Sequence, residues 1–210
     1  MYLKGNKLFW LNNTSLAAEY QVLYAQKLKD AFKKDLVGLE VGSAYGGGVE
    51  YMGWLWKDIG KVYGYDTFEG HPKDLSDDQN SHEATCMDMW YTDMFNNMNQ
   101  RTYEYQRKVL DEEGLDNVTL VKGRVNEHSF DDIKEAHYVL FDMDLVKPTK
   151  VAYKALKDKI VKGGYLLFHD AIPADHLPLL HKFIYEEVVK DGWLIVEESP
   201  PAYLTILQKI

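Results

Sequence analysis

Cysteine is nearly absent from this chain, since its 210 residues include one, Cys86. A single cysteine excludes an internal disulfide and any zinc site built from several thiolates. No apolar run approaches the roughly 18 residues that a membrane-spanning helix needs. The first five residues, MYLKG, also lack the apolar core of a signal peptide. We therefore expect residues 1–210 to form a single cytoplasmic domain.

Positive charge is also scarce, because 24 Lys and Arg face 33 Asp and Glu, for a net charge of -9. A nucleic-acid partner needs a basic face, and an anionic membrane attracts basic segments, so the balance argues against both. We therefore expect a small molecule as the partner. The sequence leaves the oligomeric state open, and a homo-oligomer is one of the possibilities. Aromatic residues make up 13% of the chain, which fits either an aromatic-lined cavity or an aromatic core.

Short apolar runs alternate with segments of helical period along most of the chain, which predicts parallel βαβ units and an α/β fold. The last two runs are too close for a crossover helix, so they predict an antiparallel hairpin around Pro200 and Pro201. The expected strands are 36–41, 61–66, 118–122, 137–142, 165–170, 193–196 and 203–207; the expected helices follow residues 12–15 and span 49–59, 148–161 and 177–189.

Residues 70–114 interrupt this rhythm, because they are far more than one crossover helix requires. Their middle part places methionines and aromatics at helical spacing, which predicts an amphipathic helix. Its apolar face either joins the core or forms a lid over a ligand. The residues concerned are Met87, Met89, Trp90, Tyr91, Met94, Phe95 and Met98.

A glycine turn follows the first expected strand, in the stretch LEVGSAYGGG at residues 39–48. Ligands of open α/β sheets bind at such strand ends, where glycines allow close approach and a new helix offers free N–H groups. The spacing from Gly42 to Gly46 does not match the dinucleotide pattern G-x-G-x-x-G. Glu40 would repel a pyrophosphate, but it suits a ligand with an ammonium group beside a carboxylate, such as S-adenosylmethionine (SAM). A purely structural turn is the alternative.

Asp66 closes the second expected strand and can accept hydrogen bonds from both hydroxyls of a ribose. Thr67 and Phe68 follow it, and the Phe68 ring can lie against an adenine face. This position suits NAD as well as SAM. The alternatives are a turn or capping role for Asp66 and ordinary packing for Phe68.

These stretches resemble class I SAM-dependent methyltransferases, and more narrowly the macrocin O-methyltransferase (TylF/MycF-type) family, which methylates macrolide sugars with a divalent metal. The resemblance covers roughly residues 36–172. Two stretches depart from the family: residues 144–149 read DLVKPT where it tends to have DLYEST, and residues 169–170 read HD where it tends to have two aspartates. The matching pieces are LEVGSAYGGG, GYDTFEGHP, GLDNVTLVKGRVNE, FDMDL and GGYLLFHDA.

The resemblance implies a Rossmann-like sheet of seven mostly parallel strands with an antiparallel C-terminal hairpin and helices on both faces. It implies that Asp66 binds the ribose of SAM and that the acids after the fourth and fifth strands hold a metal. The remaining cofactor contacts fall on two stretches. Glu40, Gly42, Ser43, Ala44, Tyr45 and Gly46 would bind the methionine part, and Gly123 and Arg124 would lie near the adenine.

Asp142 ends the fourth expected strand and His169 and Asp170 end the fifth. Neighbouring parallel strands finish at one edge, so these side chains should meet beside the SAM site, with Asp142 close to SAM itself. Two carboxylates suit Mg²⁺, which lowers the pKa of an acceptor hydroxyl. His169 would be a third ligand that widens the choice to Mn²⁺, Co²⁺ or Zn²⁺, a general base, or a hydrogen-bonded histidine lining the site.

The sequence thus predicts a SAM-dependent, metal-assisted O-methyltransferase that acts on a hydroxyl of a small molecule, such as a sugar or a phenol. Two alternatives stay open. One is an NAD(P)-dependent dehydrogenase, and the other is a protein that binds SAM without catalysis.

Overall fold

The computed structural model describes residues 2–4, 7–9, 15–43, 46–69, 102–171 and 178–210. Most of the expected lid, residues 70–101, lies outside the described residues, as do Ala44 and Tyr45. Among the residues described, no helix combines the length and the apolar composition that crossing a bilayer requires.

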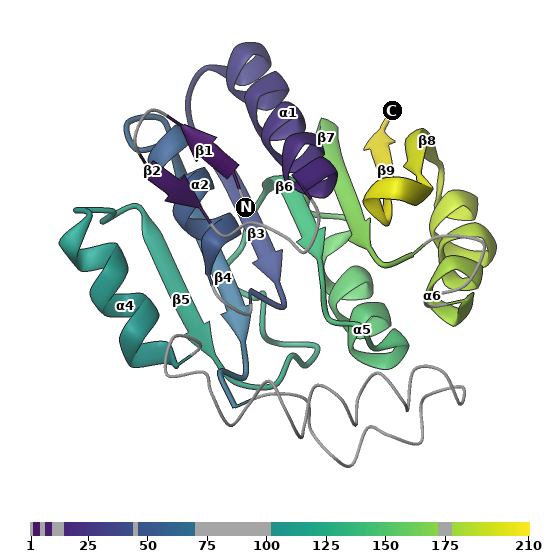
Figure 1. The fold of residues 1–210 in the computed structure, drawn as a ribbon. Helices are drawn as coiled ribbons and strands as arrows, with labels where there is room; N and C mark the ends of the chain where they lie inside the picture. Colours follow the sequence, from purple (N-terminus) through teal and green to yellow (C-terminus); the bar gives the residue numbers. More distant parts are fainter. Residues whose placement is uncertain (1, 5–6, 10–14, 44–45, 70–101, 172–177) are drawn as a thin grey trace.

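The described chain forms a seven-stranded sheet in the order β5-β4-β3-β6-β7-β9-β8 (Figure 1). The strands from β5 to β7 are parallel, and β9 is antiparallel to both of its neighbours. The predicted fold class and the C-terminal hairpin are therefore confirmed. The strands are β3 (Leu36–Val41), β4 (Gly60–Asp66), β5 (Val118–Lys122), β6 (Ala136–Phe141), β7 (Ile160–His169), β8 (Trp193–Ser199) and β9 (Leu204–Lys209).

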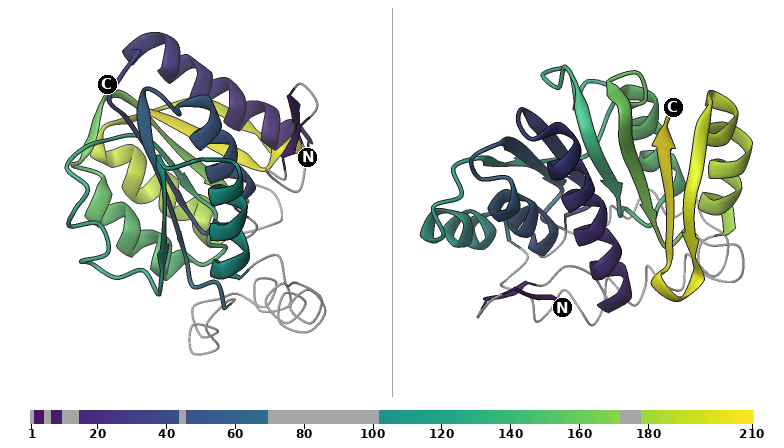
Figure 2. Two further views of the ribbon diagram at one scale, coloured as in Figure 1. Left: turned by 90° about the vertical axis from the view of Figure 1, so that its left-hand side faces the viewer. Right: turned by 90° about the horizontal axis from the view of Figure 1, so that it is seen from above.

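Helices cover both faces of this sheet, as the left view of Figure 2 shows. One apolar core lies between the sheet and α1, α2 and α4, and a second lies between the sheet and α5 and α6. Along β6, Tyr138 and Leu140 face the first core while Val139 and Phe141 face the second. The central strands are apolar throughout because both of their faces are covered. The helices are α1 (Ser15–Phe32), α2 (Gly47–Leu55), α4 (Tyr103–Glu112), α5 (Val146–Leu156) and α6 (Pro178–Phe183).

Gly163 and Gly164, expected to end a helix, lie inside β7 instead. The pairing of β6 with β7 shifts register after Ala136, and Gly163 has a φ of 84°. The two glycines therefore accommodate a bulge at the start of the strand, a role that a glycine pair fills as readily as a helix end. Helix α5 accordingly ends at Leu156, five residues before the expected limit of 161.

Three further elements differ from the expectation. Helix α2 starts at Gly47, on the glycines themselves, and ends at Leu55. The helix expected at 177–189 is α6 followed by a π-helical turn, Ile184–Val188, and a 3₁₀ turn, Val189–Asp191. An N-terminal hairpin, β1 (Tyr2–Lys4) with β2 (Lys7–Phe9), was not predicted, because three-residue strands carry too little periodic signal.

His137 on β6 makes the stability of the fold sensitive to acid. Its Nδ1 accepts a hydrogen bond of 3.2 Å from the Val37 N–H, and its ring packs edge-on against Phe32. Burial lowers the pKa of His137, while Glu135 and Asp35 oppose the shift. As pH falls below about 6.5, His137 is therefore protonated in the unfolded chain before it is protonated in the folded one. The free energy of unfolding decreases over this range until the pH reaches the lower pKa of the folded chain.

We expect His137→Asn, which keeps an acceptor but cannot be protonated, to flatten the dependence of the unfolding free energy on pH between about pH 7 and pH 5. Urea denaturation at several pH values measures this slope. A slope equal to that of the wild type would contradict the assignment, whatever the change in absolute stability.

Candidate functional site

The glycine turn lies at the carboxyl edge of the sheet, between the ends of β4 and β6. The Gly42 N–H donates to the Tyr65 carbonyl at 2.8 Å, and the Asp142 N–H donates to the Val41 carbonyl at 2.8 Å. Gly42 has a φ of 94°, and a Cβ at this position would collide with the Asp142 carbonyl oxygen. Only glycine lets the turn and the end of β6 approach this closely.

Glu40 lies beneath the first turn of α2. Its side chain is 3% exposed, and its carboxylate rests where a Cβ of Gly48 would be. It accepts a hydrogen bond from the Val49 N–H, so it satisfies one of the leading donors of the helix. Burial, and then the charge of Asp142, raise the pKa of Glu40 well above its usual range. Glu40 therefore joins strand to helix, and its contact with a ligand ammonium stays a prediction.

Ser43 and Gly46 shape the rest of the described turn. Ser43 is buried, and its hydroxyl lies over β4, 3.4 Å from where a Cβ of Gly64 would be. Gly46 has a φ of 73° and donates its N–H to the Ser43 carbonyl at 2.6 Å. It directly precedes α2 and provides no side-chain cap. The turn thus delivers a glycine-led helix N-terminus to the sheet edge, a suitable place for a carboxylate.

Asp66 ends β4 next to this turn. Its Oδ1 accepts a 2.7 Å hydrogen bond from the Phe68 N–H, so the turn role considered for Asp66 is present in the structure. Phe68 has a φ of 54° and packs edge-on against Tyr103 with ring centroids 5.5 Å apart. Because Phe68 is 8% exposed, most of its ring is covered by protein. Ribose binding by Asp66 and adenine contact by Phe68 stay predictions, as does any contact by Thr67.

Gly123 follows β5 beside Asp66, since its N–H donates to the Asp66 carbonyl at 2.9 Å. Gly123 has a φ of 148°, and a Cβ there would meet no described atom within 4 Å. Arg124 is exposed. The strand exit is thus placed next to the carboxylate predicted to bind ribose, with space above Gly123.

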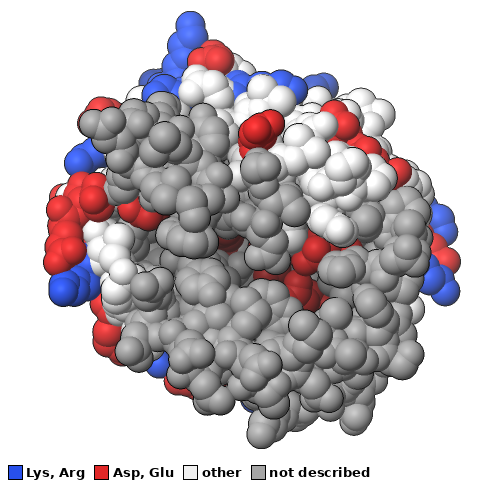
Figure 3. Space-filling view, in the orientation of Figure 1, with Lys and Arg blue, Asp and Glu red and all other residues white. Residues whose placement is uncertain are grey.

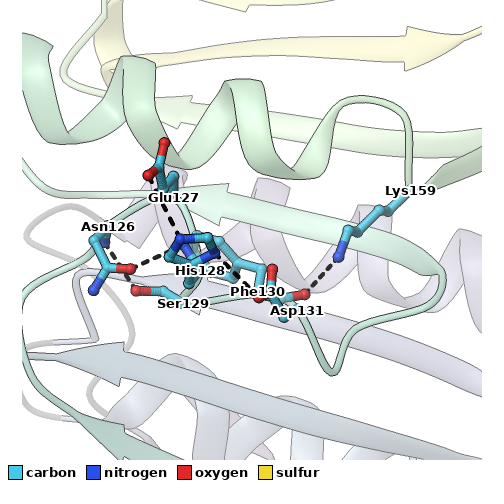
Figure 4. A network of polar contacts seen from close by, with 7 residues as sticks. All are labelled: Asn126, Glu127, His128, Ser129, Phe130, Asp131 and Lys159. Atoms are coloured by element: carbon cyan, nitrogen blue, oxygen red, sulfur yellow. Dashed lines mark hydrogen bonds and ion pairs between the residues drawn. The ribbon is translucent and has the colours of Figure 1, made fainter.

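A local network of hydrogen bonds holds the loop that follows β5 and Gly123 (Figure 4). The Asn126 N–H donates to Ser129 Oγ, and the His128 N–H donates to Asn126 Oδ1, both at 2.9 Å. Lys159 Nζ donates to the Phe130 carbonyl at 2.6 Å. The loop is therefore anchored from within and to the segment before β7.

Asp142, His169 and Asp170 meet at the ends of β6 and β7. Nδ1 of His169 lies 3.1 Å from Asp142 Oδ1 and 2.9 Å from Asp170 Oδ2. His169 is 2% exposed. Asp170 has a φ of 59° and donates its N–H to the Tyr203 carbonyl at 2.7 Å, so the C-terminal hairpin fixes it. The structure therefore brings the three predicted side chains into contact, and their chemical roles stay predictions.

The charges of this cluster act on one another. Burial by itself lowers the pKa of His169, but the carboxylates of Asp142 and Asp170 outweigh it and raise that pKa well above the usual value. Burial raises the pKa of Asp170 to about 6 against the opposing effect of His169. The charge of Asp144, which lies beyond the end of β6 at Phe141, also raises it.

The three side chains fit a divalent cation. Their ligand atoms all lie within 4.8 Å of one another, and carboxylate oxygens with one imidazole nitrogen suit Mg²⁺ or Mn²⁺. One N–H cannot donate fully to two carboxylates, yet Nδ1 faces two. A shared cation would satisfy this geometry, and the positive charge of an imidazolium would also attract both carboxylates; binding of a metal at Nδ1 would displace the proton there.

Acidic side chains are visible in the middle of the face shown in Figure 3, over the region where the central strands end in Figure 1. Among the described residues near this edge, sequence reasoning missed Gln106 on α4, a buried polar side chain against Gly46. The sequence pattern that could have found it is helical spacing, because Gln106 is three residues after Tyr103 and four before Leu110. This spacing places it on the same, inner face of a helix.

No protein-family model and no curated protein matches the chain. Solved structures match nearly all of it. CalS11, a calicheamicin methyltransferase, aligns with a TM-score of 0.69 and 18% identity over 94% of this chain and 80% of its own. The O-methyltransferase NovP aligns with a TM-score of 0.68 and 18% identity over 91% of this chain and 78% of its own. An rRNA methylase from Streptococcus thermophilus aligns with a TM-score of 0.56 and 14% identity over 95% of this chain and 99% of its own.

The fold is one that methyltransferases use. At these identities the likeness concerns the fold, and the neighbours differ in acceptor. The narrower resemblance to macrocin O-methyltransferases stays a prediction.

Proposed function

We propose that this chain is a SAM-dependent O-methyltransferase that methylates a hydroxyl of a small molecule, such as a sugar or a phenol. The observation that carries the proposal is the contact between Gly42 and Asp142. It joins a glycine turn suited to the amino-acid end of SAM to an acid–imidazole cluster suited to an acceptor hydroxyl. A methyl donor and its acceptor need this closeness, because the transfer is an in-line displacement.

The cofactor would lie along the carboxyl edge. Its carboxylate would meet the N-terminus of α2 at Gly46, and its ammonium would face the acidic side where Glu40 and Asp142 lie. Its ribose would bind Asp66, and its adenine would lie above Gly123. The sulfonium would then point toward Asp142 and His169.

The cluster would prepare the acceptor. Asp142, Asp170 and His169 Nδ1 are the groups that would hold a divalent ion, which when bound lowers the pKa of the acceptor hydroxyl. The carboxylates would also orient the hydroxyl by accepting its hydrogen bond. As the alternative to holding the ion, neutral His169 or Asp170 would receive the proton of the hydroxyl. The acceptor oxygen then bonds to the methyl carbon as the carbon–sulfur bond breaks, leaving S-adenosylhomocysteine (SAH).

A small hydroxylated acceptor is favoured over RNA. The net charge of -9 and the acidic side chains visible in Figure 3 would repel a phosphate backbone, which basic proteins bind. The TM-scores do not decide between the two, since one structure of CalS11 aligns above the rRNA methylase and a second structure of CalS11 aligns at 0.55 against 0.56. The charge supports a sugar or phenol as the acceptor.

Calorimetric titration with SAH tests the cofactor. We expect a micromolar Kd for the wild type and a loss of about 1.5 to 3 kcal/mol for Asp66→Ala, because ribose hydroxyls lose a charged acceptor. Asp66→Asn is the matched control, since it keeps the acceptor for the Phe68 N–H but removes the charge. It should weaken SAH nearly as much if ribose binding, rather than the turn, is what is lost.

The same titration with NAD, and a mass-spectrometric search for an acceptor that gains one methylene, separate the alternatives. Tight NAD binding without SAH binding would indicate a dehydrogenase. SAH binding without any methylated product, across sugars and phenols with SAM and Mg²⁺, would indicate a non-catalytic SAM-binding protein.

A further inference from the structure

Gln106 occupies an unusual place for an amide side chain. Helix α4, capped by Thr102 whose Oγ1 accepts from the Tyr105 N–H, buries two residues, Gln106 and Leu110. Gln106 is 3% exposed. Burying an amide costs free energy that an apolar side chain of the same length would not incur. Packing alone therefore does not account for glutamine at this position.

The carboxamide lies on the glycine turn. A Cβ on Gly46 would be 2.5 Å from Gln106 Oε1 and 2.9 Å from its Cδ. Gly46 is the residue with a φ of 73° that immediately precedes α2. Gln106 thus contacts the point where a ligand carboxylate would meet the N-terminus of that helix.

The same turn of α4 also touches the ribose side of the site. Tyr103, one helical turn before Gln106, packs on Phe68, and the Phe68 N–H is held by Asp66. The start of α4 therefore spans the two strand ends that the proposed cofactor would bridge. A helix placed this way can hold both turns in the geometry that receives one ligand.

We infer that Gln106 is a positioning residue for the amino-acid end of the cofactor, acting through the Gly46 turn. The inference rests on the proposed SAM site. The amide oxygen lies against Gly46, and the amide group brings an acceptor and a donor to this side of the turn without a charge. A carboxylate in place of the amide would repel the carboxylate of the ligand.

Two ligands separate this role from a general structural one. SAH carries the amino-acid end, and 5′-methylthioadenosine keeps the adenosine and the thioether but lacks that end. We expect Gln106→Met, which preserves length and packing, to raise the Kd for SAH about tenfold, the effect of one lost polar interaction. The Kd for methylthioadenosine should change less than about twofold. Gln106→Glu should raise the Kd for SAH further and again spare methylthioadenosine.

Gln208→Met is the matched control. Gln208 lies on β9 and donates to the Gly163 carbonyl, so this change removes an amide hydrogen bond far from the turn. It should leave the ratio of the two affinities unchanged. Thermal unfolding of each variant, measured in parallel, shows whether it is folded, and Gln106→Glu serves if Gln106→Met does not fold.

Equal weakening of both ligands, or an unchanged Kd for SAH in both Gln106 variants, overturns the inference while leaving the SAM site intact. Failure of the wild type to bind SAH overturns the proposed function and the inference together. Selective loss of SAH affinity supports both.

Discussion

Gly42→Ala is expected to lower the free energy of unfolding by roughly 2 to 6 kcal/mol. Two costs add: a φ of 94° strains a residue with a side chain by about 1 to 3 kcal/mol, and overpacking against the Asp142 carbonyl adds about 1 to 3 kcal/mol. The strand ends cannot separate freely, because the Asp142 N–H is hydrogen-bonded to Val41. Urea denaturation measures the loss, and SAH titration should show weaker binding.

Gly192→Ala is the control for backbone strain. Gly192 has a φ of 91°, and a Cβ there would meet no described atom within 4 Å. It should cost only the strain, about 1 to 3 kcal/mol, and leave SAH affinity unchanged. Equal destabilisation by the two substitutions would show that Gly42 is not in tight contact with the end of β6, and the link between turn and cluster would fail.

Asp142→Asn and Asp170→Asn should each reduce turnover by at least about 10²-fold, the contribution typical of a positioned acid–base group. Each change removes one of the two carboxylates that flank His169 Nδ1. Asp170→Asn should leave SAH affinity within about threefold, because Asp170 lies on the side of the cluster away from the turn. Asp142→Asn should weaken SAH as well, since Asp142 borders Gly42.

The matched control for charge is Asp144→Asn. Asp144 acts on Asp170 through its charge, whereas Asp142 and Asp170 lie within 3.1 Å of His169 Nδ1. We expect its turnover to stay within about threefold of the wild type. Full turnover in Asp170→Asn would remove the cluster from the mechanism.

Binding of the metal can be measured without the acceptor, as a change in the stability of the fold. Mg²⁺ or Mn²⁺ at about 100 times its Kd should stabilise the wild-type fold by about 2.7 kcal/mol. EDTA should reverse the shift, and both asparagine variants at the cluster should lack it. EDTA should also abolish turnover while leaving SAH affinity nearly intact. Undiminished turnover in EDTA would show that Asp142, His169 and Asp170 work without a metal.

The sequence by itself determined the seven strands of the main sheet and their order along the chain. Each expected strand is present, because strands covered on both faces are continuous apolar runs that can be recognised locally. The prediction from sequence failed where one local pattern is compatible with two structures. Gly163 and Gly164 suit a helix end and a strand bulge equally, and only the pairing of β7 with β6 selected the bulge.

Part of the candidate site was also predictable, because parallel strands end at a common edge. That rule placed Asp142 beside His169 and Asp170 from their positions alone. It gave no distances and no direction for a side chain. The 2.9 Å contact of His169 with Asp170 depends on the C-terminal hairpin, which holds the Asp170 N–H through Tyr203.

Tertiary structure alone decided where Glu40, Phe68 and Gln106 point. Glu40 turns beneath α2 because Gly48 leaves room for its carboxylate, and Phe68 turns inward onto Tyr103. Gln106 reaches the glycine turn from a helix that begins more than 50 residues further along the chain. Local periodicity fixes which face of an element is buried, but the partner on that face is set by packing between distant segments.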